Sequence, residues 1–348
     1  MTAELSPVPG TLTKLSDLHD LLAAYGAKPV HARKIHSAWL GASEWPTEAN
    51  AGRRVRLPDA LVKALPDIRA KLDAVAQIHS RYPGSDPESE RLLVTLADEQ
   101  MIESVLLPRK GVCVSTQIGC AVGCVFCMTG RSGLIRQLTD LEIVAQVAMA
   151  RKLRQETKKV VFMGMGEPSH NLANVMRAVE YLADYGRFGH KELVISTVGD
   201  ERLFAALHAS KVRPALAISL HTVDDAKRRK LLPKGCRMSV DDLIDAADEW
   251  AKTSGYPLQV EWTLIEGRND SEQEISLLAE KLKGRYAMVN FIPVNMVNGT
   301  NCKRPAREHA VNLIRFLRSK GIIATLRVSA AQDVDGGCGQ LRARILKV

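Results

Sequence analysis

The chain lacks the features of a secreted or membrane-spanning protein. None of its apolar runs reaches the roughly 20 residues that cross a bilayer. Its first six residues lack the basic and then apolar order of a signal peptide. No internal repeat or low-complexity tract interrupts the 348 residues. We therefore expect a cytoplasmic protein with no membrane partner, whose seven cysteines are mostly reduced.

Composition allows a sizeable core and favours a polyanionic partner. Hydrophobic residues make up 46% of the chain, and its length suits one large domain with a smaller one. The net charge of +9 favours a partner such as RNA. Many basic proteins never bind nucleic acid, so charge alone leaves both alternatives open.

The first 85 residues are expected to form a small helical domain. Apolar residues at helical spacing predict three helices there, over 15–25, 29–40 and one that begins at Pro58. The turn-rich segment 82–87 marks the boundary with a second domain, 86–348. That domain opens with a β extension made of two strands, 91–96 and 102–107.

From residue 112 onward, strand-like and helix-like segments alternate six times, which predicts a parallel sheet. The apolar strand-like runs are 112–115, 160–163, 193–196, 216–220, 260–264 and 289–292. The amphipathic helices between them are 140–153, 172–185, 202–209, 240–253, 271–282 and 307–320. The chain is too short for eight such units, so we expect a six-unit, partly open β/α barrel. In such barrels chemistry gathers at the carboxyl ends of the strands.

Three cysteines follow the first strand of this barrel, in a C-x3-C-x2-C spacing: Cys120, Cys124 and Cys127. Cysteine thiolates hold iron–sulfur clusters, and three ligands would leave one iron of a [4Fe–4S] cube open. Zinc usually takes four ligands, and no histidine lies nearby. A structural disulfide does not fit a cytosolic chain. The spacing, with Phe126 before the last cysteine, resembles the radical S-adenosylmethionine (SAM) superfamily, in which the open iron chelates SAM.

Glycines and small polar residues follow the later strands. The turn Gly164-Met165-Gly166-Glu167 follows the second strand. Taken alone it is more often a tight turn with a surface glutamate. One β/α unit after the cysteine triplet, we expect Gly166 and Glu167 to bind the SAM ammonium group. Serines at strand ends usually cap helices or form turns, but convergence on one barrel mouth favours cofactor contacts for Ser196, Ser219, Leu220, His221 and Asn295.

Two further cysteines have unusual positions. Cys113 lies on the first barrel strand, seven residues before Cys120. Cys338 lies between glycines near the carboxyl terminus, as expected of an exposed, mobile loop. A buried thiol is the usual state of a cytosolic cysteine, and we interpret Cys236 and Cys302 in that way.

Taken together, these motifs resemble the RlmN/Cfr family of radical-SAM RNA methyltransferases over nearly the whole chain. Arg33-Lys34-Ile35 and Trp39 resemble, more loosely, that family's RNA-contacting helices. The resemblance implies a partial (β/α)6 radical-SAM barrel with a small N-terminal RNA-contacting domain. It also implies a [4Fe–4S] cluster, two SAM molecules per turnover and a reducing electron donor. The segments that carry it are 113–120, 163–168, 219–221, 293–295 and 338–341, with the cysteine triplet.

The resemblance further implies methylation of an adenine ring carbon in ribosomal RNA, with transfer RNA as a second candidate. The first SAM methylates Cys338, and a radical from the second takes a hydrogen from that methyl group, whose carbon adds to the adenine. Cys113 helps to remove the ring proton and releases the product by forming a disulfide with Cys338. Glu103 matches an acid/base residue close to the substrate. Carbon 2 is favoured over carbon 8 by resemblance alone.

The chain departs from the family pattern just before Cys338. An arginine is replaced by Ala330, and Gln332 and Gly336-Gly337 also differ. These changes leave the radical machinery in place and bear on the substrate. Two other functions stay open: a radical-SAM enzyme with a non-RNA substrate, and an RNA-binding module with a structural cluster. The Cys113 and Cys338 pair argues against the first, and the polar strand ends argue against the second.

Overall fold

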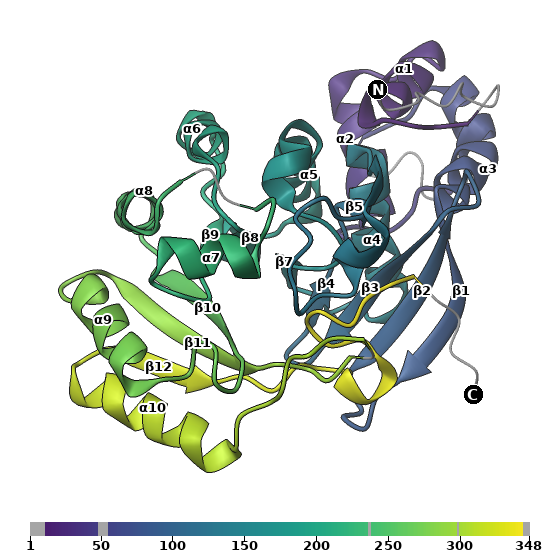
Figure 1. Cartoon of the computed structure of the whole chain (residues 1–348). Helices are drawn as coiled ribbons and strands as arrows, with labels where there is room; N and C mark the ends of the chain where they lie inside the picture. The colour runs from purple at the N-terminus through teal and green to yellow at the C-terminus, as the bar shows by residue number, and fades with distance from the viewer. Residues whose placement is uncertain (1–10, 48–54, 236–237, 298, 344–348) are drawn as a thin grey trace.

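The computed structural model describes residues 11–47, 55–235, 238–297 and 299–343. Ten strands form one curved sheet, with helices along its outer side (Figure 1). None of the helices in these ranges is long and apolar enough to cross a membrane. In spatial order the strands are β1 (Ala76–Pro83), β2 (Glu90–Leu96), β3 (Met101–Leu107), β4 (Gly111–Cys113), β7 (Lys159–Phe162), β8 (Leu193–Thr197), β9 (Ala215–Ser219), β10 (Leu258–Leu264), β11 (Ala287–Pro293) and β12 (Ile323–Leu326).

The strands from β4 to β12 pair in parallel and form the predicted partial six-unit barrel. Val260, Trp262 and Leu264 of β10 are fully buried beneath the helices, whereas Glu261 between them belongs to the opposite face, because side chains alternate along a strand. The helices that link the strands are α4 (Asp140–Leu153), α5 (Leu172–Gly186), α6 (Glu201–Ala209), α7 (Asp225–Leu231), α8 (Val240–Ser254), α9 (Glu272–Leu282) and α10 (Arg307–Ser319). The parallel strands β4, β7, β8, β9, β10 and β11 and six of these helices lie where the sequence pattern places them.

The sequence pattern does not predict the short strands β5 (Gln117–Gly119) and β6 (Leu134–Gln137), nor three further elements. Helix α7 is only seven residues long and strongly basic, so it lacks an apolar stripe. Strand β12 has four residues, one of which is exposed. Strand β1 carries polar residues such as Gln77, His79 and Arg81 at alternate positions and is half exposed. It pairs antiparallel with β2 and continues the sheet to its outer edge.

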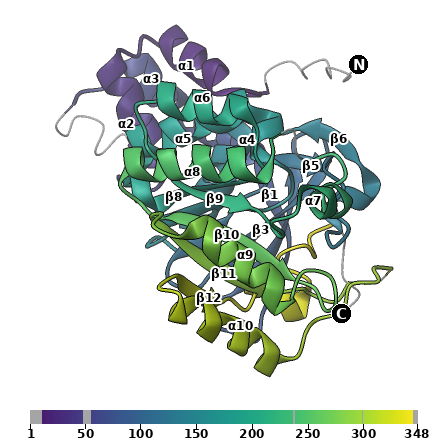
Figure 2. The ribbon, with the colours of Figure 1, turned by 60° about the vertical axis from the view of Figure 1, so that its left-hand side comes forward.

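The three N-terminal helices pack against the outer side of the barrel, away from α7 and from the β5–β6 ladder, which spans Gln117–Gly119 and Leu134–Gln137 (Figure 2). They are α1 (Leu15–Ala24), α2 (Pro29–Trp39) and α3 (Asp59–Ala74). Leu18, Leu22 and Ile35 are fully buried in this contact. On α2, His36 is also fully buried, and its Nδ1 lies 2.6 Å from the Tyr181 hydroxyl of α5.

Burial lowers the pKa of His36 from 6.5 to about 3, and the neighbouring His19 and Arg33 add to this effect. The folded chain therefore keeps His36 neutral, while the unfolded chain protonates it below pH 6.5. Stability then falls as the pH falls. Between pH 7.5 and 5 the wild-type protein should lose about 2 kcal/mol more of its unfolding free energy than His36→Gln. Urea unfolding at both pH values measures this, and equal losses would contradict it.

Candidate active site

The loop that carries the cysteine triplet rises from the two-stranded ladder of β5 (Gln117–Gly119) and β6 (Leu134–Gln137). The backbone N–H of Cys120 donates to the Gly133 carbonyl at 3.0 Å, and that of Cys127 donates to Cys124 at 3.0 Å. Gly119 has φ +74°, and a Cβ there would lie 2.0 Å from the Gly133 oxygen. Only glycine fits this close approach, which closes the base of the loop.

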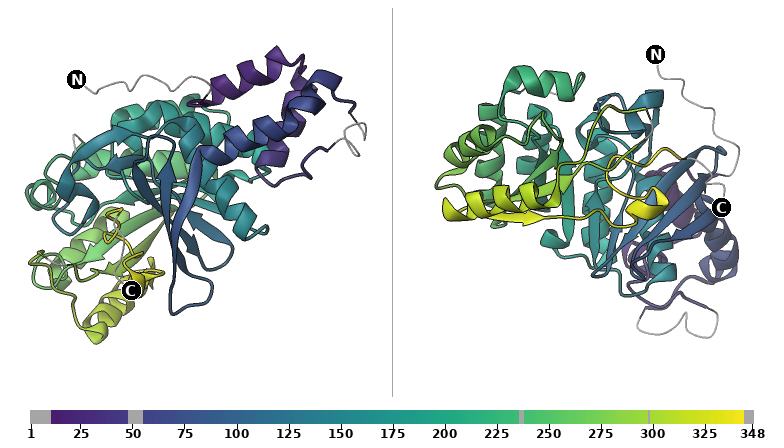
Figure 3. Two further views of the ribbon diagram at one scale, coloured as in Figure 1. Left: turned by 90° about the vertical axis from the view of Figure 1, so that its right-hand side faces the viewer. Right: turned by 60° about the horizontal axis from the view of Figure 1, so that its bottom comes forward.

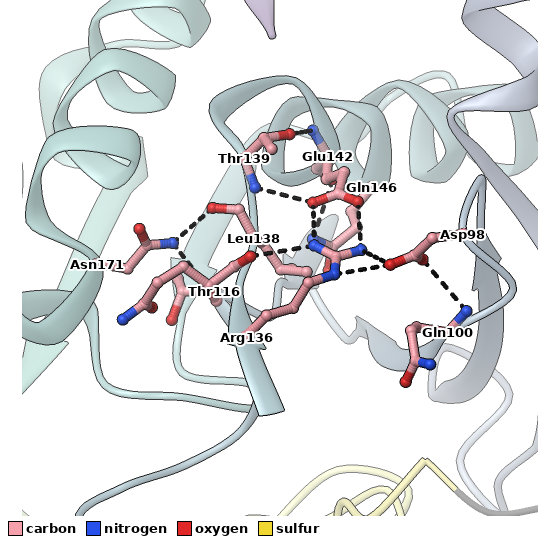
Figure 4. A network of polar contacts seen from close by, with 10 residues as sticks. Asp98, Gln100, Thr116, Arg136, Leu138, Thr139, Glu142, Gln146 and Asn171 are labelled. Atoms are coloured by element: carbon pink, nitrogen blue, oxygen red, sulfur yellow. Dashed lines mark hydrogen bonds and ion pairs between the residues drawn. The ribbon is translucent and has the colours of Figure 1, made fainter. Parts of the chain in front are cut away.

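A polar network fixes the ladder to three neighbouring elements (Figure 4). The guanidinium of Arg136 on β6 contacts Asp98, in the turn after β2, at 2.7 Å and Glu142 of α4 at 2.7 Å. The Asn171 amide donates to the carbonyls of Thr116 and Leu138, at 2.8 and 2.7 Å. The ladder therefore holds the cysteine loop over the carboxyl ends of the barrel strands.

The three thiols of the loop face one another closely enough to interact. Burial raises the pKa of Cys120 to about 12, and Cys127 adds to the shift. Burial, Cys127 and Cys120 together raise the pKa of Cys124. Soft thiolates of this kind favour iron–sulfur clusters. In the described ranges no three metal-binding side chains meet closely enough for a single ion, but the ligands of a cube each bind a different iron and lie farther apart.

Glu167 lies beside this loop and is buried. Its Oε1 accepts from the Thr197 hydroxyl at 2.6 Å, and its Oε2 accepts from the Val198 backbone N–H at 3.1 Å. Its charge adds to the raised pKa of both Cys120 and Cys124. The carboxylate is thus held at the cysteine loop by the end of β8.

The two glycines before Glu167 lie at close approaches between chain segments. A Cβ on Gly164 would lie 2.7 Å from the Val114 carbonyl. A Cβ on Gly166, which has φ +108°, would lie 2.7 Å from the Gln117 side chain. Both glycines therefore let this turn pack against the chain that leads from β4 into β5.

Other predicted cofactor residues line the ends of β8 and β9. The Ser196 and Ser219 hydroxyls lie 3.5 Å apart. Leu220 is buried, and His221 has φ +63° with its Nδ1 accepting from the Thr263 N–H at 2.9 Å. The His221 ring packs edge-on against Phe126 of the cysteine loop, with centroids 4.9 Å apart. Burial and Arg228 lower the pKa of His221 to about 3, so it supports the loop as a neutral ring.

The segment around Cys338 is hydrogen-bonded to the cysteine loop. The Met128 N–H donates to the Gly339 carbonyl at 2.7 Å, and a Cβ on Gly339 would lie 2.9 Å from the Phe126 oxygen. The Asn295 amide donates to the Cys338 carbonyl at 2.9 Å and to the Ser329 hydroxyl at 3.0 Å. Asn295, which the sequence predicts to contact the cofactor, therefore holds the Cys338 loop in the structure.

Cys113 and Cys338 lie close enough for their charges to interact. Burial, with the charge of Cys338, raises the pKa of Cys113 to about 12. The surrounding protein also raises the pKa of the exposed Cys338 thiol, whereas Arg327 opposes this and Glu261 adds to it. Both cysteines are free thiols. The structure thus brings together two cysteines that are 225 residues apart in the chain, since 338 − 113 = 225.

Comparison with known proteins agrees with this geometry. The model of the radical SAM superfamily matches residues 114–279. A Pseudomonas aeruginosa protein named probable RNA methyltransferase is 53% identical over 329 residues, which is 94% of each chain. An Azoarcus protein of the same name is 52% identical over 335 residues, 96% of each chain. The chain belongs to the radical SAM superfamily. A crystal structure of a radical SAM methyltransferase from Sphaerobacter thermophilus has a TM-score of 0.84 at 34% identity, covering 97% of this chain and all of that one.

A radical SAM enzyme uses a [4Fe–4S] cluster and SAM. The residues present fit both groups, because three thiols are gathered on one loop and Glu167 lies beside them. Cys120, Cys124 and Cys127 would hold the cluster, and Glu167 with the ends of β8 and β9 would hold SAM. Cys302 is buried against the same loop, as expected of a structural thiol. Cys236 lies outside the described residues.

Sequence reasoning missed three charged residues: Glu261 and Arg327, whose charges act on Cys338, and Arg91, which pairs with Glu103. The Glu261 Oε1 accepts from Asn290 at 2.8 Å and lies 3.3 Å from the Arg327 guanidinium. Arg91 pairs with Glu103, and both side chains are fully buried. A signal was available for Arg91 and Glu261, which lie in the predicted strands 91–96 and 260–264. An ionisable residue inside an apolar strand is rare unless it is paired.

Replacing Cys120, Cys124 or Cys127 by alanine should abolish bound iron, because each thiolate anchors one iron of the cube. Iron and sulfide analysis with an ultraviolet–visible spectrum measures this after anaerobic reconstitution. Cys302→Ala is the matched control, since it removes a thiol that packs on the same loop, and it should keep full iron. A triplet variant with a normal iron content would overturn the ligand assignment.

Proposed function

We propose that this radical SAM enzyme methylates a ring carbon of adenine in RNA, in the manner of the RlmN/Cfr family. Ribosomal RNA is the proposed substrate, with transfer RNA as a second candidate, and carbon 2 is favoured over carbon 8. The observation that carries the proposal is the Cys338 loop, which is hydrogen-bonded to the cysteine loop and lies close enough to Cys113 to affect its pKa. The relatives named probable RNA methyltransferase support it.

Cys113 and Cys338 suit a covalent route of methyl transfer. The cluster and SAM supply methyl groups and a radical that abstracts hydrogen. Cys338 is exposed, so its sulfur can carry a methyl group to an unstacked base. The methylene carbon bonds to the ring carbon, which gives up its hydrogen as a proton, and the electron left on the ring would pass to the cluster. The base then remains attached to Cys338 through the methylene carbon.

Cys113 is placed to release that product. Its sulfur attacks the Cys338 sulfur and forms a disulfide, and the carbon–sulfur electron pair stays with the methylene carbon, which takes a proton and becomes a methyl group. A reducing donor must then restore the two thiols. Because burial raises the pKa of Cys113, the resting residue keeps its proton, and Arg327 favours the thiolate needed for the attack.

Exposed cations beside the cysteine loop support a polyanionic substrate. The end of α7 and the segment after it are hydrogen-bonded to this loop. The Val125 N–H donates to the Leu231 carbonyl at 3.0 Å, and the Lys234 N–H donates to the Val122 carbonyl at 3.0 Å. The exposed cations here, which we call the cationic rim, are Arg131, Arg229, Lys230, Lys234, Arg268 and Lys303. In the described part of the chain none of them forms an ion pair, unlike Lys227, which pairs with Glu274.

Removing three charges of the cationic rim, as in R229A/K230A/K234A, should weaken RNA binding most at low salt. Each cation that contacts a phosphate releases counterions, so the slope of log K against log salt should fall by about 2 for single-stranded RNA. Fluorescence anisotropy with a labelled RNA fragment across a salt series measures this slope.

The matched control removes three charges from the opposite end of the barrel, as in K283A/R315A/K320A. These cations are exposed near the carboxyl ends of α9 and α10. This variant changes the net charge equally and should keep the wild-type slope. Equal slopes for both triple variants would count against a substrate bound at the mouth.

We also propose that residues 1–85 contact RNA and that residues 86–348 hold the catalytic barrel. Arg33 is exposed on α2, donates to the Asp184 carbonyl at 3.1 Å and stacks on Tyr185. Arginine side chains and partly exposed aromatic rings both contribute to the binding of single-stranded nucleic acid. Strand β1 lies within the first unit and pairs with β2 of the second, so the two units share one sheet.

Cys113→Ala should trap a covalent RNA adduct at Cys338, because no second thiol remains to take the sulfur. Wild-type protein should carry a methyl group on Cys338, and Cys338→Ala should show neither methyl nor adduct while keeping its iron. Denaturing gels of RNA-bound variants and peptide mass spectrometry with labelled methionine measure both. A Cys113→Ala variant that turns over normally, with no adduct, would contradict the covalent route.

A further inference from the structure

The chain segment that carries Cys338 returns to the β extension at the far edge of the sheet. Figures 1 and 3 show the yellow carboxyl-terminal segment lying against the blue strands β1–β3. The contacts are made by residues on both sides of Cys338, in the C-terminal segment 331–343. This places strands that precede the barrel in direct contact with the proposed methyl carrier.

A buried ion pair on β2 and β3 makes two of these contacts. The Arg91 guanidinium donates through Nε to the Glu103 Oε1 at 2.8 Å and through Nη1 to the Val334 carbonyl at 3.3 Å. The Glu103 Oε2 accepts from the Arg342 backbone N–H at 2.8 Å. Both side chains are fully buried, and the Arg91 guanidinium lies 4.7 Å from the centre of the Tyr82 ring. These two hydrogen bonds from the pair end on the backbone of the C-terminal segment.

The hairpin turn between β1 and β2 makes a third contact. The Ser85 N–H donates to the Asp333 carboxylate at 2.7 Å. A Cβ on Gly84 would lie 3.3 Å from the Ala331 Cα, so the turn packs tightly against the segment. The contacts of Asp333 and Val334 precede Cys338 and that of Arg342 follows it, so the segment is fixed at both ends.

The glycines before Cys338 belong to the same contact. A Cβ on Gly336 would lie 3.1 Å from the Arg91 Cβ and 2.8 Å from the Ala331 Cβ. A Cβ on Gly337 would lie 2.7 Å from the Asn295 amide nitrogen. The sequence suggests that these glycines make the loop mobile, whereas in the structure they let it approach Arg91 and Asn295 closely.

We propose that Arg91 and Glu103 are positioning residues, which clamp the C-terminal segment to the β extension so that Cys338 stays opposite Cys113. The proposal rests on the proposed function of the two cysteines. Were sheet stability the only need, two apolar side chains would serve as well as a buried ion pair. The pair instead supplies one donor and one acceptor to backbone groups on either side of Cys338. The acid/base role that the family resemblance implies for Glu103 is a separate prediction.

Thiol–disulfide exchange measures this positioning without SAM turnover or RNA. Oxidised glutathione takes two electrons and two protons from Cys113 and Cys338, giving one protein disulfide and two reduced glutathiones. The equilibrium constant reports the effective concentration of one thiol at the other. It is measured on anaerobic holoenzyme by peptide mass, counting only chains whose Cys338 is unmodified.

Glu103→Gln should lower this constant about tenfold or more, because an amide offers only one acceptor and leaves Arg91 without its counter-charge. Asp333→Ala removes the exposed contact with Ser85 and should lower the constant about threefold. Glu90→Gln is the matched control. It breaks the Arg81–Glu90 pair on the same hairpin, which is not one of the contacts described above with the C-terminal segment, and should leave the constant unchanged.

Amide hydrogen exchange gives the second measurement. Peptides from 331–343 should exchange faster in Glu103→Gln and Asp333→Ala, while peptides from β10 keep their wild-type protection. If Glu103→Gln loses protection in β10, the sheet itself is disturbed. The test then rests on Asp333→Ala, which changes an exposed side chain. The clamp would be overturned if Asp333→Ala and a folded Glu103→Gln both kept the wild-type disulfide equilibrium constant and the wild-type amide exchange in 331–343. A shifted constant in an enzyme that makes no RNA product would keep the clamp and reject the proposed function.

Discussion

The backbone of the cysteine loop is hydrogen-bonded to a different part of the chain on each side. Val125 donates to Leu231, where α7 ends, and Met128 donates to Gly339, next to Cys338. A loop without regular structure must satisfy its backbone groups somewhere, and here two N–H groups are satisfied by the two segments that would meet the substrate. The cluster ligands, the cationic rim and the methyl carrier are therefore placed relative to one another by the same short loop.

The barrel supplies the second constraint, because polar side chains inside it must find hydrogen-bond partners. Glu261 and Asn290 lie on neighbouring strands and hydrogen-bond at 2.8 Å, and the Thr325 hydroxyl donates to the side-chain Oδ1 of Asn290 at 2.8 Å. This chain of partners holds the buried carboxylate near Arg327, which faces both Cys113 and Cys338. Burial raises the pKa of Cys113, and the nearby guanidinium of Arg327 favours its thiolate when that is needed.

The alternation of strands and helices predicts the partial barrel, because a parallel sheet brings the carboxyl ends of its strands to one edge. The closeness of Cys113 and Cys338 is implied by the family resemblance. The sequence does not predict which partners each side chain takes. Asn295 and Glu167 stand where strand periodicity places them, yet Asn295 holds the Cys338 loop and Glu167 is held by Thr197 and Val198. The Arg91–Glu103 pair depends on antiparallel register between β2 and β3 and on the return of the last residues, which local patterns cannot give.

The account depends most on methylene transfer from Cys338, and the isotope content of the product tests this directly. Cells fed methionine with a trideuterated methyl group would place three deuteriums on Cys338. Because one hydrogen is removed from that methyl group before the carbon joins adenine, the methyladenosine in RNA should carry two deuteriums. Nucleoside mass spectrometry of RNA from these cells, compared with a deletion strain, reads this number. A methyladenosine that depends on this protein and retains three deuteriums would contradict transfer through Cys338.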